Sequence, residues 1–111
     1  MSRRVIISSQ AEEDIARAAA WYEARKEGLG EQFADRVQET IERIKLNPVG
    51  YQIVYRGLRR ASLRQFKDWG VFFTIRLNHS LVIACLSGKR HPSLAIERAA
   101  GVKPIKPPAP G

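Results

Sequence analysis

Two apolar runs lie close together in the second half of the chain. Over residues 71–77, Val71, Phe73, Ile75 and Leu77 alternate with Phe72, Thr74 and Arg76, which is the period-two pattern of a strand with the first set on a core. Residues 81–86 are apolar throughout, as expected of a short central strand that is covered on both faces. The polar residues Asn78, His79 and Ser80 lie between the runs and predict a turn. Together the two runs predict a β-hairpin.

The first half of the chain instead has the periodicity of amphipathic helices. Ser9-Gln10-Ala11-Glu12 fits a capping box, which predicts a helix from Gln10 with acidic residues in its first turn. Gly28 and Gly30 are predicted to end this helix. Its expected apolar face consists of Ala11, Ile15, Ala18, Ala19 and Tyr22.

A second helix is predicted over residues 31–46. Asn47 and Pro48 end it, because proline disfavours a helical residue before it and lacks the N–H of the next helical hydrogen bond. The two helices therefore predict an antiparallel hairpin whose apolar stripes must cover a sheet. The stripe of the second helix consists of Phe33, Val37, Ile41 and Ile44.

Residues 4–8 predict a first strand, and residues 59–66 predict a strand that leads through a 67–70 turn into the β-hairpin. Residues 52–55 could form a further short strand before a turn at Gly57. The expected fold is α+β: an N-terminal strand, an antiparallel helical hairpin, and an antiparallel three-strand meander forming one sheet. A short helix is predicted at 93–100. Residues 1–100 are expected to form one domain, and the Pro-rich residues 101–111 a disordered tail.

Composition narrows the class of protein. The longest uncharged apolar run, residues 81–86, is far shorter than the ~20 residues that span a bilayer. The short apolar run after Arg4 does not make a signal peptide, so we expect a cytoplasmic protein. Cys85 lies within the most apolar run and is expected to be a buried small hydrophobe.

The net charge of +8 comes entirely from the second half of the chain. Residues 1–55 hold eight Lys and Arg against nine Asp and Glu, whereas residues 56–111 hold eleven against two. This asymmetry predicts an acidic partner, either nucleic acid or an acidic protein segment. A solvated basic surface without a partner is the alternative.

Clustered basic residues are the candidate site. If residues 59–64 form a strand, Arg60 and Arg64 are expected to project from one face, with the cluster at 89–91 close by. Arginine binds phosphate or carboxylate oxygens with two hydrogen bonds, so the set suits nucleic acid or an acidic peptide. The candidate set is Arg56, Arg59, Arg60, Arg64, Lys67, Arg76, Lys89, Arg90 and His91.

Catalysis and metal binding have less support in the sequence. His91 could act as a general acid or base, with Lys89 and Arg90 stabilising a phosphorane, but no carboxylate lies near it in sequence to orient it. His79 is expected to be an ordinary turn residue. Two histidines without suitably spaced acidic or cysteine companions predict no metal site, and no cofactor motif is present.

Several motifs, in this order and spacing, resemble the RelE/ParE superfamily of type II toxins over residues 4–98. They are A-E-E-D-I-A-R-A-A-A-W-Y, G-L-G-E-Q-F-A-D-R-V-Q-E-T-I-E-R-I-K-L-N-P, L-R-R-A-S-L-R-Q-F, W-G-V-F-F-T-I and L-V-I-A-C-L-S-G-K-R-H-P. The helix followed by N-P and the apolar hairpin look most like the ParE branch and the plasmid-stabilisation proteins. The resemblance implies a toxin that is neutralised by a cognate antitoxin. We expect the antitoxin to bind an apolar surface along the helical hairpin and the sheet edge, flanked by Arg59, Arg60 and Arg64. The expected partner-binding residues are Arg59, Arg60, Arg64, Lys89 and Arg90.

Within the superfamily, ParE-like toxins poison DNA gyrase and RelE-like toxins cut mRNA on the ribosome. A His-Gly-x-Arg-Asp pattern often ends the last strand in the family, whereas this chain has Ser87-Gly88-Lys89-Arg90-His91, and no tyrosine follows Tyr55. The resemblance therefore favours a gyrase poison that is not an enzyme. The alternatives are an endoribonuclease using Arg60, Arg64, Lys89, Arg90 and His91, and a relative that has lost toxicity.

Overall fold

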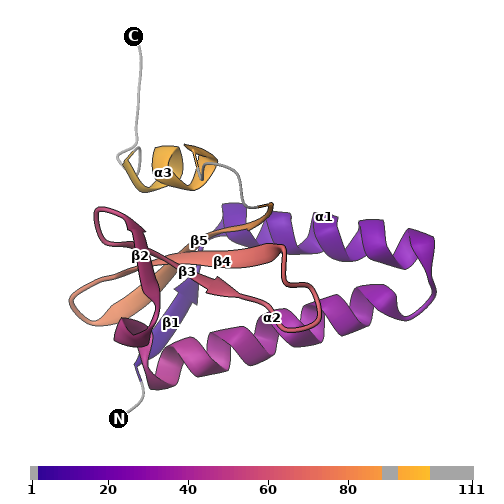
Figure 1. The fold of residues 1–111 in the computed structure, drawn as a ribbon, viewed down its shortest axis with the longest axis horizontal. Helices are drawn as coiled ribbons and strands as arrows, with labels where there is room; N and C mark the ends of the chain where they lie inside the picture. The colour runs from indigo at the N-terminus through magenta and orange to yellow at the C-terminus, as the bar shows by residue number, and fades with distance from the viewer. Residues whose placement is uncertain (1–2, 89–92, 101–111) are drawn as a thin grey trace, which may run out of the picture.

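The computed structural model describes residues 3–88 and 93–100 (Figure 1). Its elements are β1 (Arg4–Ile7), α1 (Ser9–Arg25), α2 (Leu29–Leu46), the 3-10 turn η1 (Pro48–Gly50), β2 (Gln52–Tyr55), β3 (Leu58–Ser62), β4 (Trp69–Ile75), β5 (His79–Ser87) and α3 (Ser93–Ala100). The α+β class, the helical hairpin and the C-terminal helix are confirmed. The predicted tail at 101–111 and the basic cluster at 89–91 lie outside the described residues. Among those that are described, no helix is both long and apolar enough to cross a membrane.

α1 begins one residue earlier than the capping box predicted. The Ser8 side chain accepts a hydrogen bond of 3.1 Å from Ala11 N, so Ser8 and not Ser9 is the N-cap. Ser8 N also donates to Val82 O in β5. This pairing with the sheet holds Ser8 extended at the end of β1, and so selects it from the two adjacent serines.

α2 begins at Leu29, so the predicted start at Glu31 is wrong and Gly30 lies inside the helix. Gly28 precedes the helix with φ of 88°, a left-handed conformation that favours glycine. The Glu23 carboxylate accepts hydrogen bonds of 2.9 Å from Gly28 N and from Gly30 N. It thereby satisfies donors at the start of α2 that have no intrahelical partner. α2 ends at Leu46, as predicted.

The sheet has five strands in the order β1-β5-β4-β3-β2. The antiparallel meander has four strands and not three, because β2 pairs with β3. β1 is parallel to β5, with Arg4 opposite His79 and Ile7 opposite Val82. β5 therefore lies between β1 and β4, as predicted for a central strand.

Two turns, β3–β4 and β4–β5, lie at other positions than predicted. β3 ends at Ser62 and not at residue 66, and Gln65 beyond it has a positive φ of 70°. β4 begins at Trp69, inside the predicted 67–70 turn. His79 is the first residue of β5, and Arg76 N donates to His79 O across the tight turn. Leu77 was expected on the core face, but it lies in this turn and is 90% exposed.

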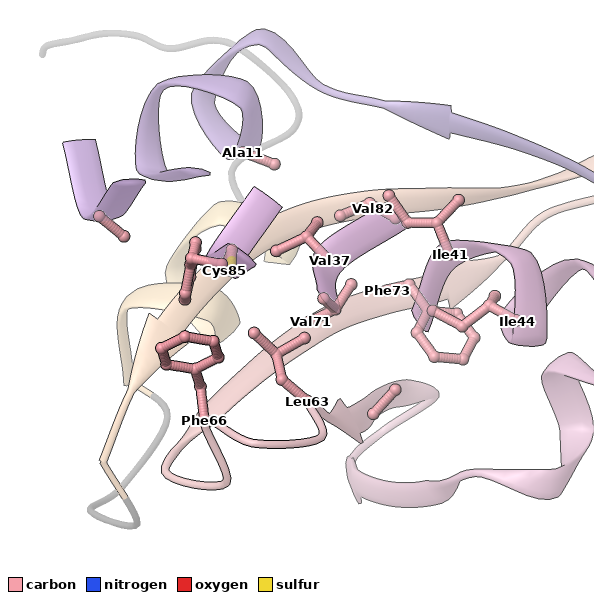
Figure 2. Packing of buried hydrophobic residues seen from close by; sticks show 13 residues of the cluster. Ala11, Val37, Ile41, Ile44, Leu63, Phe66, Val71, Phe73, Val82 and Cys85 are labelled. Atoms are coloured by element: carbon pink, nitrogen blue, oxygen red, sulfur yellow. The ribbon is translucent and has the colours of Figure 1, made fainter. Parts of the chain in front are cut away.

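The sheet is covered on both faces. The face that packs on α1 and α2, here the hairpin face, buries Val71, Phe73 and Val82 against the stripe of α2 (Figure 2). The opposite face, here the α3 face, buries Leu58, Phe72, Ile83 and Ala84 with Ala95 of α3. β4 thus has both faces in a core, whereas its alternation predicted one.

A β-bulge explains how the apolar run of β5 serves both faces. Phe72 is opposite Ala84 and Phe73 is opposite Val82, so Ile83 is an extra residue in the ladder. Ile83 and Ala84 belong to the core of the α3 face, whereas Val82 and Cys85 belong to that of the hairpin face. The prediction of a strand that is covered on both faces is confirmed.

Replacing Gly30 with alanine is expected to lower the free energy of unfolding by about 1–3 kcal/mol. A Cβ at Gly30 would lie 2.5 Å from the backbone oxygen of Ala19 in α1, so the two helices would have to move apart. Urea denaturation measures the effect, with the exposed Ala34→Gly in the same helix as a reference for helix propensity alone. An increase in stability, the usual result of Gly→Ala inside a helix, would contradict this close approach.

Candidate partner-binding surface

The sheet separates the basic residues that the sequence grouped together. Arg59 is opposite Phe73, whose side chain packs on the hairpin face, whereas Arg60 is opposite Phe72, which packs on the α3 face. Because paired residues in a sheet share a face, the two adjacent arginines project in opposite directions. They do not form one binding site.

Arg60 lies on the α3 face and is held there by three contacts. Its guanidinium donates to Ser62 Oγ at 2.7 Å and to Asp68 O at 3.1 Å. It lies 5.7 Å from the centre of the Phe72 ring, within the range of a cation–π contact. A Cβ at Gly70 would lie 2.5 Å from Arg60 Nε, so the glycine makes room for the arginine to lie flat across β4.

Arg59 forms hydrogen bonds with the segment that joins α2 to the sheet. Its Nη1 donates to Val49 O at 3.2 Å and to Tyr51 O at 2.7 Å. Beside it, the end of α2, the η1 turn and β2 expose three apolar side chains: Leu46, Val49 and Ile53, with exposed fractions of 69%, 67% and 50%. We call these three residues the apolar corner.

Arg64 lies on the hairpin side. Its Nη1 is 3.9 Å from Glu39 Oε2 of α2, and its side chain is 67% exposed. The expectation that Arg60 and Arg64 project from one face is therefore wrong, because β3 ends before Arg64 and the chain then turns towards α2. Lys89, Arg90 and His91 lie outside the described residues.

The sequence analysis missed a buried ion pair between Asp14 of α1 and Arg98 of α3. Arg98 Nη1 donates to Asp14 Oδ2 at 2.7 Å, and Arg98 Nη2 donates to Asp14 Oδ1 at 3.2 Å. The Asp14 side chain is 3% exposed and that of Arg98 is 14% exposed. Cys85 N also donates to Asp14 Oδ2 at 2.9 Å, and Arg98 Nη1 donates to Ile83 O at 3.0 Å. The pair joins both helices to β5.

The sequence contained a signal for this pair. Asp14 lies three residues after Ala11 and four before Ala18, so it shares the buried face of α1 with these two residues. A carboxylate on a buried helical face requires a partner. The partner itself, 84 residues further along the chain, could not be identified from spacing.

An open cavity of about 850 Å³ lies beside this pair, between α1, the end of β5 and α3. Aromatic and aliphatic side chains line much of it, among them Trp21, Trp69, Phe72, Leu86 and Leu94. Cys85 also lines it, and burial together with the nearby Asp14 carboxylate raises the pKa of the thiol to about 12. Cys85 is therefore a neutral thiol at physiological pH and not an activated nucleophile, as its apolar surroundings predicted.

Replacing Arg98 with methionine is expected to lower the free energy of unfolding by about 3–5 kcal/mol, because the buried Asp14 carboxylate loses its main charged partner. Arg17→Met is the matched control. Arg17 binds the same carboxylate at 3.2 Å, but its side chain is 70% exposed, so we expect a loss of at most about 1 kcal/mol. Chemical denaturation of the two variants measures the difference. Equal losses would contradict the importance of the buried position.

Comparison with known proteins agrees with this architecture. A structure titled "Chromosomal ParDE TA system from P. aeruginosa" is similar to this chain, with a TM-score of 0.59 and 15% sequence identity. The similarity covers 79% of this chain and 98% of that one, and at this identity it shows a shared fold. No curated protein sequence matches the chain significantly.

The family comparison goes further than the fold. Residues 5–92 match the profile of the family described as "ParE toxin of type II toxin-antitoxin system, parDE". The match includes both helices of the hairpin and all of the sheet except Arg4. The chain therefore belongs to the ParE toxin family of type II toxin–antitoxin systems.

Proposed function

We propose that this protein is a cytoplasmic toxin that inhibits DNA gyrase and is neutralised by a cognate antitoxin. The observation that carries the proposal is the match to the ParE toxin family over residues 5–92. Inhibition of gyrase requires the toxin to bind and trap the enzyme, not to supply an acid–base pair. The described residues fit that requirement, since Cys85 is a neutral thiol and Arg59, Arg60 and Arg64 do not converge on one site.

The arrangement of the arginines argues against the endoribonuclease alternative. That mechanism needs Arg60 and Arg64 to converge on one phosphate beside Lys89, Arg90 and His91. Arg60 is instead held against Ser62 and Asp68 O on the α3 face, whereas Arg64 lies near Glu39 on the hairpin side. Two donors on opposite faces of a sheet cannot stabilise the same phosphorane.

The apolar corner is the surface that we assign to the antitoxin. Leu46, Val49 and Ile53 are large, exposed and within one short segment, residues 46–53, and β2 in that segment is an edge strand with no charged residue. Such an edge can accept an extended partner segment through backbone hydrogen bonds. Arg59 and Arg64 lie on the same side and would attract acidic residues of that segment. Arg60, which we expected to flank this surface, faces the other way.

Purified protein added to gyrase, ATP and supercoiled plasmid is expected to make linear DNA accumulate, visible after treatment with detergent and protease. The reason is that a gyrase poison stabilises the cleaved complex, which the detergent then converts into a double-strand break. Reactions without the toxin, and with toxin preincubated with its antitoxin, are the controls. Unchanged cleavage and supercoiling by an active gyrase would overturn the proposed target.

Serine substitutions at Leu46, Val49 and Ile53 together are expected to weaken antitoxin binding at least tenfold, because they remove the apolar centre of the interface. Isothermal titration with the purified antitoxin measures the dissociation constant. Leu77→Ser is the control, since Leu77 is 90% exposed but lies in the β4–β5 turn. If the triple variant bound as tightly as the wild type, the antitoxin would have to occupy another surface.

A further inference from the structure

Three chain segments that each carry exposed arginine lie at one end of the sheet: the start of β1, the β2–β3 turn and the β4–β5 turn, on the left side of Figure 1. Arg4 at the start of β1 is opposite His79 at the start of β5. Leu58 at the start of β3 is opposite Thr74 near the end of β4. The start of β1, the β2–β3 turn and the β4–β5 turn therefore all lie at this end. We call Arg3, Arg4, Arg56 and Arg76 the arginine rim.

The rim is held in place by the backbone around it. Arg3 N donates to Lys45 O at the end of α2, and its guanidinium donates to Arg76 O and Leu77 O in the β4–β5 turn. Arg76 Nε donates to Thr74 Oγ1 at 3.2 Å. The positive φ values of Arg56 (40°) and Gly57 (83°) define the tight turn between β2 and β3. These side chains are thus presented from fixed turns and not from a loose loop.

The exposed rim arginines have no carboxylate partner among the described residues. The five ion pairs of that part of the chain use Arg17, Arg36, Lys45, Arg64 and Arg98. Residues 47–88 contain six Lys and Arg against a single acidic residue, Asp68, which lies near the opposite end of the sheet. Arg4, Arg56 and Arg76 therefore create an uncompensated positive potential.

The dimensions of the rim fit a nucleic-acid backbone. From β1 to β2 there are four strand spacings of about 4.8 Å each, which gives a width of roughly 19 Å. This exceeds the ~12 Å width of the DNA major groove, so the rim can reach phosphates on both sides of a groove. Each guanidinium offers a planar pair of donors that matches phosphate oxygens.

An acidic protein segment fits this surface less well. A protein interface normally has a contiguous apolar centre. Along the rim itself the exposed apolar residues are Ile6, Tyr55 and Leu77, and each belongs to a different strand or turn. The apolar corner lies beside the rim and not within it, at the end of α2, in the η1 turn and on β2.

We propose that the arginine rim binds the phosphate backbone of duplex DNA without sequence preference. The inference rests on the proposed function in one respect: the duplex in question would be the DNA held by the gyrase. The rim then gives the toxin a contact with the DNA as well as with the enzyme. This contact favours association with gyrase that is engaged on its substrate.

Anisotropy of a fluorescein-labelled 20-bp duplex, titrated with the full chain between 50 and 200 mM KCl, tests the proposal. The variant carries Arg4→Gln, Arg56→Gln and Arg76→Gln. The slope of log K against log salt is negative, and each lost phosphate contact lowers its magnitude by about 0.9, so we expect the magnitude to fall by about 2.7. The affinity at 50 mM KCl should fall at least tenfold.

The matched control carries Arg25→Gln, Lys26→Gln and Lys67→Gln and loses the same net charge. These residues lie at the opposite end of the molecule, where Gln65 Nε2 donates to Gln32 Oε1 and so joins the β3–β4 loop to the start of α2. We expect its affinity and slope to stay near those of the wild type. Far-UV circular dichroism and thermal melting confirm that both triple variants are folded.

Three results would overturn the rim assignment. The first is wild-type binding by the rim variant, and the second is an equal loss in both triple variants, which would reflect net charge alone. The third is rim-dependent binding of a decaglutamate peptide without binding of the duplex, which would identify a protein partner. Gyrase poisoning is scored separately. Its absence, with rim-dependent DNA binding intact, would overturn the proposed function and leave the rim assignment supported.

Discussion

The fold depends on which groups form hydrogen bonds with the backbone of β5 beyond the point where β1 ends. β1 pairs with β5 only as far as Ile7 opposite Val82, although β5 continues to Ser87. Beyond that point Asp14 of α1 accepts a hydrogen bond from Cys85 N, and Arg98 of α3 donates to Ile83 O. The two side chains neutralise each other, so backbone groups and charges are satisfied together in a buried place.

This ion pair also connects the two helical layers that cover the sheet. The Asp14 end of α1 holds the helical hairpin on one sheet face, and Arg98 holds α3 on the other. The bulge at Ile83 divides the apolar residues of β5 between the two faces. A continuous apolar strand is stable here because both faces are covered, which a simple hairpin could not achieve.

The arginines that hold the fold together and the arginines that are exposed lie in different parts of the molecule. Arg59, Arg60 and Arg98 are committed to backbone oxygens or to Asp14, whereas Arg4, Arg56 and Arg76 are exposed at one end of the sheet. The hydrogen bond from Arg3 N to Lys45 O brings that end close to the end of α2, where the apolar corner begins. In our proposals, an antitoxin on the apolar corner would lie beside the arginine rim and could shield it.

The sequence by itself determined most of the elements and that the helical hairpin covers a sheet, but it did not place α3 on the opposite face. The 3.6-residue stripe of α2, the apolar run of β5 and the stop at Pro48 are local signals, and the structure follows them. Helix starts and turns shifted by one to four residues, because contacts such as that of Ser8 N with Val82 O choose among equivalent local options.

Only the tertiary structure decided which side chains meet. Arg60 and Arg64 alternate correctly for one face of a strand, yet the chain turns after Ser62 and sends them to opposite sides. The local sequence predicts that Asp14 is only an acidic residue in the first turn of a helix. Its role in the buried ion pair depends on a partner 84 residues away. Sequence periodicity describes one element at a time, whereas a site is formed by several, so its geometry depends on contacts that spacing along the chain does not encode.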